Sequence, residues 1–163
     1  MRTHLAYAAA LALVACSPDK DSLAQKAADD RAVAQVEAIQ KQKPPPRAIE
    51  PRPILFAEIQ KYNLFGPGCA FAPQGSIGAV LLTRSKAGFM KLSEGMTRFA
   101  ADAGSARLPF DTRSHYVGKA MSLSLTRSDT SGDDDLRWHA RLIVTDTFDQ
   151  PVYQADGLVQ CGA

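Results

Sequence analysis

Apolar and polar residues alternate along much of the second half of the chain. In residues 136–144 every second position is apolar, and three of the positions between them are Arg or His. The same alternation recurs in residues 121–126. A period of two is typical of a strand that buries one face. With the shorter runs, the pattern predicts nine strands, at residues 69–71, 79–84, 88–92, 96–101, 115–117, 120–127, 136–145, 152–155 and 158–161.

Short segments rich in Gly, Ser and Asp separate these runs. Examples are residues 85–88, residues 93–95 and the pair Asp156-Gly157. Such segments are typical of hairpin turns, so we predict an antiparallel meander. Many short strands with one apolar face leave few exposed edges when they close on themselves. The predicted fold class is therefore mainly β, a small antiparallel barrel or sandwich.

A short helix is expected before the first strand. Residues 54–62 follow a proline, and Leu55, Ile59 and Tyr62 fall on one helical face. The segment Gly66-Pro67-Gly68 then ends the helix. We predict that this helix packs on the sheet, with a first strand in its place as the alternative.

Residues 19–43 differ from the rest, because they are rich in Ala and Gln and contain no Gly or Pro. This composition favours a helix, and its apolar stripe is too narrow to bury against a core. We expect an exposed helix; a coiled coil or partner-binding helix is the alternative. The prolines of residues 44–53 then favour extended polyproline II, a semi-rigid spacer rather than a ligand for a proline-recognition groove.

The first residues have the features of a secretory signal peptide. Arg2 precedes an almost uninterrupted apolar run at residues 5–14, which is too short to span a bilayer. The segment Leu13-Val14-Ala15-Cys16 resembles the lipobox of bacterial lipoproteins. The resemblance implies cleavage before Cys16 and lipidation of its thiol, and Ser17 in place of Asp implies export to the outer membrane. An ordinary signal peptide, with Cys16 an incidental thiol, is the alternative.

Together these segments predict three parts: a signal peptide at residues 1–15, a lipid-anchored helical and Pro-rich tether at residues 16–53, and a β-rich domain at residues 54–163. The chain has three cysteines. With Cys16 lipidated, Cys69 and Cys161 remain, and the periplasm is oxidising, so we predict a disulfide between them. Two thiols that bind a metal are the alternative, weakened because no pair of His residues lies near them.

The net charge of +2 argues against a dedicated nucleic-acid binder. Within the domain the charges are segregated: residues 84–127 carry an excess of bases and residues 128–163 an excess of acids. These halves either pair across the sheet or leave a basic surface. Such a surface would meet an anionic envelope component, either lipopolysaccharide or peptidoglycan carboxylates, or an acidic protein.

Residues for catalysis are few. The chain has no Gly-x-Ser-x-Gly motif, and His115 and Ser114, as neighbours on a strand, should point to opposite faces. His139 should point away from the face of Trp138. The acidic residues 129–135 suit either Ca²⁺ or a solvated hairpin. We predict no cofactor, no metal and no catalytic residue.

One further similarity concerns residues 114–119, Ser-His-Tyr-Val-Gly-Lys. They distantly resemble the presentation region of membrane-bound inhibitors of c-type lysozyme, which are lipoproteins with a small β-barrel. The resemblance implies that Ser114 and Lys119 face an acidic cleft, with Tyr116 and Arg113 beside them as candidate partner-binding residues. The fuller Ser-Gly-x-x-Tyr and Trp-Thr-Lys-Gly patterns of that family are not present.

The sequence therefore predicts an outer-membrane lipoprotein, facing the periplasm, with a non-enzymatic binding or envelope-assembly module. The second hypothesis is an inhibitor of a lysozyme-type cell-wall hydrolase. The third is a hydrolase without a recognisable motif.

Overall fold

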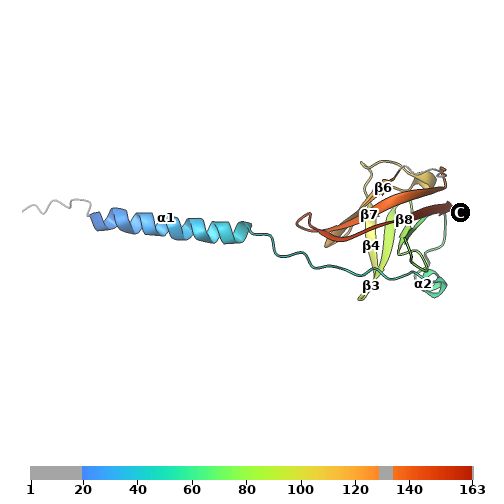
Figure 1. Cartoon of the computed structure of the whole chain (residues 1–163), viewed down its shortest axis with the longest axis horizontal. Helices are drawn as coiled ribbons and strands as arrows, with labels where there is room; N and C mark the ends of the chain where they lie inside the picture. Colours follow the sequence, from blue (N-terminus) through green and yellow to red (C-terminus); the bar gives the residue numbers. More distant parts are fainter. Residues whose placement is uncertain (1–19, 129–133, 163) are drawn as a thin grey trace, which may run out of the picture. The chain divides into compact units, whose positions relative to one another are not determined.

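The computed structural model describes residues 20–128 and 134–162. The chain forms two compact units, Met1–Pro44 and Pro45–Ala163. In the first, helix α1 (Lys20–Lys41) is exposed throughout residues 22–41, which confirms the predicted exposed helix (Figure 1). Within the described residues, no helix combines the length and the apolar character needed to cross a bilayer.

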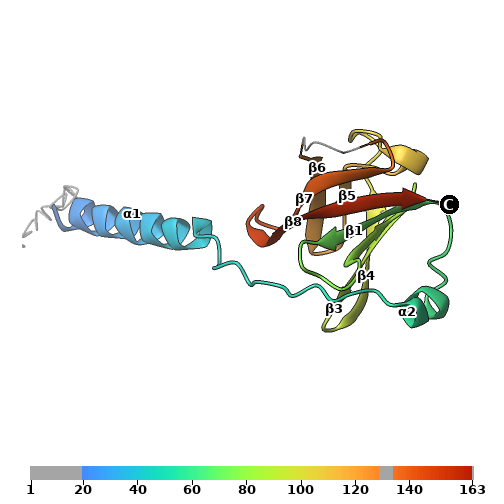
Figure 2. The same ribbon diagram turned by 45° about the vertical axis from the view of Figure 1, so that its right-hand side comes forward.

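The second unit contains a closed antiparallel barrel in which the strands follow one another in chain order (Figure 1). The first strand also pairs with the last along six residues, and this ladder closes the sheet (Figure 2). The predicted antiparallel β fold is confirmed as a barrel. Its strands are β1 (Gly68–Pro73), β2 (Leu81–Thr83), β3 (Ala87–Leu92), β4 (Gly95–Ala101), β5 (His115–Val117), β6 (Met121–Arg127), β7 (Arg137–Asp146) and β8 (Pro151–Gly162).

The prediction of two separate strands at residues 152–155 and 158–161 was wrong, because both belong to β8. Gly157, which suggested a turn, lies in the strand opposite Ala140 of β7. A Cβ atom on Gly157 would lie 2.2 Å from the carbonyl oxygen of Ala72. The glycine therefore permits a close approach of two strands and does not mark a turn.

The alternating residues of the strands fill the inside of the barrel. An eight-stranded barrel is about wide enough for side chains to occupy its interior completely. Trp138, Tyr116, Phe71 and Phe99 are the largest side chains there, each at most 1% exposed. A smaller apolar layer lies outside the barrel and consists of Ile54, Leu64 and Leu82, with Ile59, Ala70, Ala79, Phe89 and Met96 packed against them.

Helix α2 (Phe56–Lys61) covers this outer layer, as predicted for a short helix on the sheet. The face that contacts the sheet differs from the prediction. Ile59 packs inward, whereas Leu55 and Tyr62 are 53% and 42% exposed. The helix is only six residues long. Its attachment depends on the flanking residues Ile54 and Leu64.

The proline-rich segment before α2 lies against the barrel. The amides of Ile49, Arg52 and Ile54 donate hydrogen bonds to the carbonyls of Val152, Lys91 and Ala79, at 3.1, 2.8 and 2.8 Å. Because proline has no amide hydrogen, the residues between and directly after the prolines provide these bonds. The compact unit therefore begins at Pro45, earlier than the predicted start of the domain at residue 54.

The predicted disulfide between Cys69 and Cys161 is confirmed. The two residues are direct partners in the β1–β8 ladder, and their Cα atoms are 4.0 Å apart. Cys69 is 2% exposed, and its Sγ lies 3.6 Å from the hydroxyl of Thr112, just after the short helix η1 (Pro109–Asp111). The bond thus ties together the two strands that close the barrel.

Replacing both barrel cysteines (Cys69→Ser with Cys161→Ser) should lower the free energy of unfolding by about 2–5 kcal/mol, since the bond closes a loop of some 90 residues. Urea unfolding measures the loss. Dithiothreitol should lower the midpoint of the wild-type chain to that of the double variant and leave the variant unchanged. Equal midpoints for oxidised wild type and variant would contradict this stabilising role.

Candidate functional site

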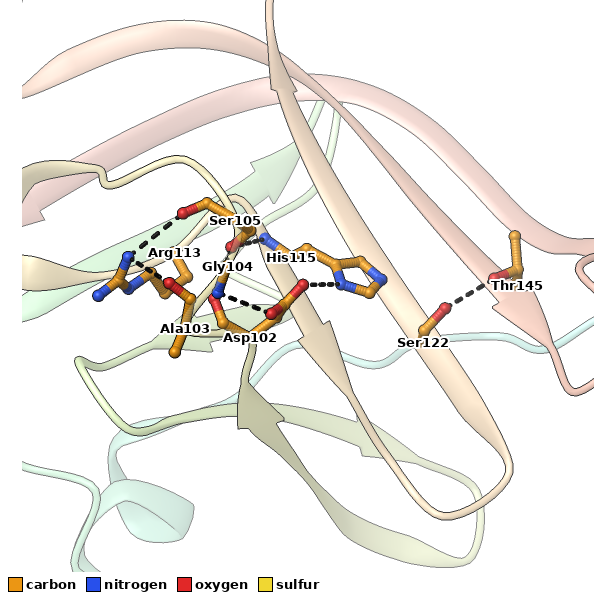
Figure 3. A network of polar contacts seen from close by, with 8 residues as sticks. All are labelled: Asp102, Ala103, Gly104, Ser105, Arg113, His115, Ser122 and Thr145. Atoms are coloured by element: carbon orange, nitrogen blue, oxygen red, sulfur yellow. Dashed lines mark hydrogen bonds and ion pairs between the residues drawn. The ribbon is translucent and has the colours of Figure 1, made fainter.

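The loop between β4 and β5, residues 102–114, folds over one end of the barrel. Helix η1 lies in this loop and contacts β1 and β8. Thr112 is fully buried, and Leu108 packs against the core. Polar groups at the base of this loop form a network of hydrogen bonds, which Figure 3 shows from close by.

Asp102 and His115 form the centre of this network (Figure 3). One carboxylate oxygen of Asp102 accepts the amide of Gly104 at 2.9 Å, and the other lies 3.1 Å from Nδ1 of His115. The hydrogen bond from the amide of Gly104 is the main cause that lowers the pKa of Asp102 below its ordinary value, and the contact with His115 lowers it further. The amide of His115 donates in turn to the hydroxyl of Ser105 at 3.3 Å.

Arg113, one of the predicted partner-binding residues, is part of the same loop. Its guanidinium donates to the carbonyls of Ala103 and Ser105, at 3.1 and 3.2 Å (Figure 3). These bonds fasten the two arms of the loop to each other. The side chain therefore has a structural function whether or not it also contacts a partner.

Tyr116 was predicted to lie beside Ser114 and Lys119 on a contact surface, and the structure corrects this. Its side chain points into the barrel and is 0% exposed. The hydroxyl accepts the amide of Arg113 at 2.8 Å and donates to the carbonyl of Arg84 at 3.0 Å. Burial raises the pKa of this hydroxyl. Tyr116 is a core residue that cannot meet a partner in this fold.

Ser114 and Lys119 stand at opposite ends of β5. The backbone of Ser114 is held by bonds to Ala106 and Leu125, whereas Lys119 is exposed in the turn that leads to β6. Each residue of a strand adds about 3.3 Å to its length, so β5 holds Ser114 and Lys119 apart. The arrangement that the likeness to lysozyme inhibitors implies is therefore not assembled by β5 itself.

The Asp102–His115 pair also bears on the hydrolase hypothesis, since a carboxylate and an imidazole are two members of a nucleophilic triad. Ser124 lies opposite His115 in the β5–β6 ladder. The hydroxyl of Ser122, the next outward residue on β6, is engaged by Thr145 at 2.9 Å (Figure 3). The contacts of the pair join the two ends of the β4–β5 loop, and their evident function is to hold it.

The basic residues of 84–127 are distributed over several local contacts. Lys91 pairs with Glu58 of α2, and Arg107 pairs with Asp111 at 2.9 Å. In the acidic half, Arg141 forms a bidentate ion pair with Asp156, with N···O distances of 2.7 and 2.8 Å. Of these three pairs, Arg107–Asp111 and Arg141–Asp156 each lie within one half, and Lys91 pairs with a residue of α2 outside both halves. Residues 129–133 of the acidic loop lie outside the described residues, so the Ca²⁺ alternative stays a prediction.

A second surface, which sequence reasoning did not identify, surrounds α2. We define the α2 face as Leu55, Phe56, Tyr62 and Phe65 with the neighbouring bases Lys61, Arg84 and Lys86. The four apolar side chains are 42–65% exposed. The rings of Phe56 and Phe65 meet edge to face with centroids 6.2 Å apart. The signal in the sequence is four large apolar residues in a segment too short to bury them all.

One basic side chain contacts these rings, and two more belong to the turn after β2. The ammonium of Lys61 lies 5.2 Å from the centre of the Tyr62 ring. Arg84 donates to the carbonyl of Leu64 at 2.6 Å, and Lys86 is exposed in the same turn. The Lys91–Glu58 pair fixes α2 to β3 and lowers the pKa of the Glu58 carboxyl. The face is therefore rigidly placed, aromatic and basic.

No protein-family model, no curated protein and no solved structure matches the chain.

Replacing Asp102 by Asn should lower the urea midpoint at pH 7. Because the folded-state pKa of this carboxyl is lowered, its ionised form stabilises the fold above the unfolded pKa near 3.8, and this contribution is lost as the pH falls through the folded value. The difference from wild type should therefore shrink between pH 5 and pH 2. A difference that stays constant, or an equal effect from Asp135→Asn at an exposed position, would contradict the role given to Asp102.

Proposed function

We propose that this protein is a lipid-anchored, non-enzymatic binding module of the bacterial outer membrane, and that the α2 face binds the acidic phospholipid surface of the envelope. The carrying observation is the group of four exposed apolar side chains with lysine and arginine at its border.

The anchor in this proposal rests on the sequence. Residues 1–19 lie outside the described residues, and the argument for lipidation is the segment Leu13-Val14-Ala15-Cys16 after an apolar run. The disulfide between Cys69 and Cys161 fits an oxidising compartment such as the periplasm. Acyl chains on Cys16 would keep the domain close to a membrane and raise its effective concentration there.

The composition of the α2 face suits the headgroup region of a bilayer. Aromatic and aliphatic side chains insert at the boundary between headgroups and acyl chains, while lysines remain beside the phosphates. Each Lys or Arg near an anionic leaflet contributes about 1 kcal/mol. The short range of this attraction requires the basic and apolar groups to lie together, as Lys61 and Tyr62 do.

The other two functions receive less support from the contacts described above. For the inhibitor, Ser114 and Lys119 stand at opposite ends of one strand and Tyr116 is buried. For the hydrolase, Asp102 and Arg113 are engaged in holding their own loop. By contrast, the four exposed apolar side chains of the α2 face belong to neither of the two apolar layers of the domain.

Cys16 should carry the lipid. In cells fed an alkyne-labelled palmitate, the wild-type chain should be labelled, and Cys16→Ser should abolish the label. Cys69→Ser, which changes a disulfide cysteine, serves as the control and should keep it. A label that persists in Cys16→Ser would refute the anchor without bearing on the α2 face.

Binding of the α2 face is tested with the mature chain, residues 16–163, carrying Cys16→Ser so that no acyl chain contributes. It should sediment with vesicles of phosphatidylglycerol and phosphatidylethanolamine and much less with phosphatidylcholine. Phe56→Ser with Phe65→Ser should weaken binding about tenfold because the inserted apolar area is lost. Lys61→Glu with Lys86→Glu should weaken it by a similar factor and remove its dependence on salt.

Leu136→Ser is the matched control, because Leu136 is a 50% exposed leucine on the loop before β7 and does not belong to the α2 face. It should leave vesicle binding unchanged. Equal binding to neutral and acidic vesicles, or equal losses in the control and the α2 variants, would overturn the proposal. A protein captured by the α2 face in the absence of lipid binding would replace it with a protein-docking function.

A further inference from the structure

Strand β4 is paired unequally on its two sides. Toward β3 it is paired along its whole length, from Gly95 opposite Leu92 to Ala100 opposite Ala87. Toward β5 only its last two residues are paired, Ala100 with Val117 and Ala101 with Tyr116. Among the described residues, no strand pairs with residues 95–99 on this second side.

The register shows which backbone groups point to the unpaired side. The amide of Ala101 donates to the carbonyl of Lys86, so Ala101 is bonded toward β3. In an antiparallel strand, successive residues direct their amide and carbonyl groups to opposite sides. Residues 95, 97 and 99 therefore bond toward β3, while the N–H and C=O groups of Met96 and Arg98 point to the unpaired side.

The edge is unpaired because β5 ends early. After Val117 the chain turns back at once, with the amide of Gly118 donating to the carbonyl of Met121 at 2.7 Å. Gly118 packs closely on the ring of Phe99, where a Cβ atom would lie 2.9 Å from a ring carbon. The turn thus seals the interior beside Phe99, while the backbone edge of residues 95–98 stays without a partner strand.

We propose that this edge, Gly95–Arg98 of β4, binds an extended segment of a partner protein as an added strand. An unpaired strand edge is a template for β-augmentation, in which main-chain hydrogen bonds provide affinity and alternate side chains provide specificity. Met96 and Arg98 together offer two donors and two acceptors. A guest of about five residues would satisfy all four.

Charge decides what kind of segment fits. Arg98 is exposed on the outer face of β4, and it carries the charge of this edge, because Lys91, opposite Met96 on β3, is already paired with Glu58. A guest with a carboxylate opposite Arg98 forms a cross-strand pair of opposite charge, whereas a basic residue there is repelled. Two copies of β4 paired with each other would bring their Arg98 side chains near one another, which disfavours a second copy as the guest.

The chain's own proline-rich segment is also a poor guest. Three consecutive prolines at residues 44–46 lack the amide donors that a ladder needs. The remaining occupant is therefore an acidic, extended segment of another protein. This function uses the backbone edge of β4, whereas the proposed function of the α2 face uses its apolar and basic side chains; Gly95 and Met96 nevertheless line the same cavity as Lys61 and Tyr62.

The test uses the mature chain, which contains every residue that the structure describes, and three synthetic heptapeptides. The first alternates Thr and Val with Glu at its centre, the second has Lys in place of Glu, and the third is the Glu peptide with alternate amides N-methylated. NMR hydrogen exchange reports on the amides of Met96 and Arg98. The Glu peptide should slow their exchange tenfold or more, and the Lys and N-methylated peptides should have much smaller effects.

Arg98→Glu should reverse the preference, so that the Lys peptide protects the amide of Met96 better than the Glu peptide does. Arg137→Glu is the matched control: Arg137 is an exposed strand arginine that lies opposite Gln160 of β8, and its reversal should change nothing. If Arg98→Glu does not fold, the three peptides on the wild-type chain decide alone. The proposal is overturned if millimolar Glu peptide leaves both amides unprotected, or if all three peptides act equally.

Discussion

The ladder between β1 and β8 is the interaction on which the rest of this structure depends. Without it, the first and last strands of the meander would each present an unpaired edge, and the apolar face of the sheet would lie open to water. Six residue pairs and the Cys69–Cys161 bond hold the seam closed. Gly157 allows the two strands to approach closely where a side chain would meet the carbonyl of Ala72.

Closure determines where function is located. Because Trp138, Tyr116, Phe71 and Phe99 fill the interior, a ligand has to meet the outer surface. Two features there have no evident use within the domain: the apolar α2 face and the unpaired side of β4. The two proposals, lipid binding by the first feature and strand addition by the second, make use of them.

Local patterns predicted much of the fold, and they were insufficient where contacts are distant. Alternation located β6 and β7 closely, and the odd cysteine count led to the disulfide. The pattern could not show that Gly157 lies in a strand, because that depends on β1, more than 80 positions earlier. The helical period placed Leu55 and Tyr62 on the face that contacts the sheet. It could not show that Ile54 and Leu64, on either side of α2, attach the helix instead. The Asp102–His115 contact joins the two ends of a loop, and no spacing rule predicts it.

A closed barrel with a filled interior should act only through its outer surface. The most direct measurement is a map of backbone amide shifts by NMR when bicelles containing phosphatidylglycerol are added to the mature chain. We expect shifts confined to residues 55–65 and the turn at residues 84–86. Shifts spread through the interior side of β6 and β7, around Leu123 and Val144, would mean that the barrel opens to take up a ligand and would contradict this expectation.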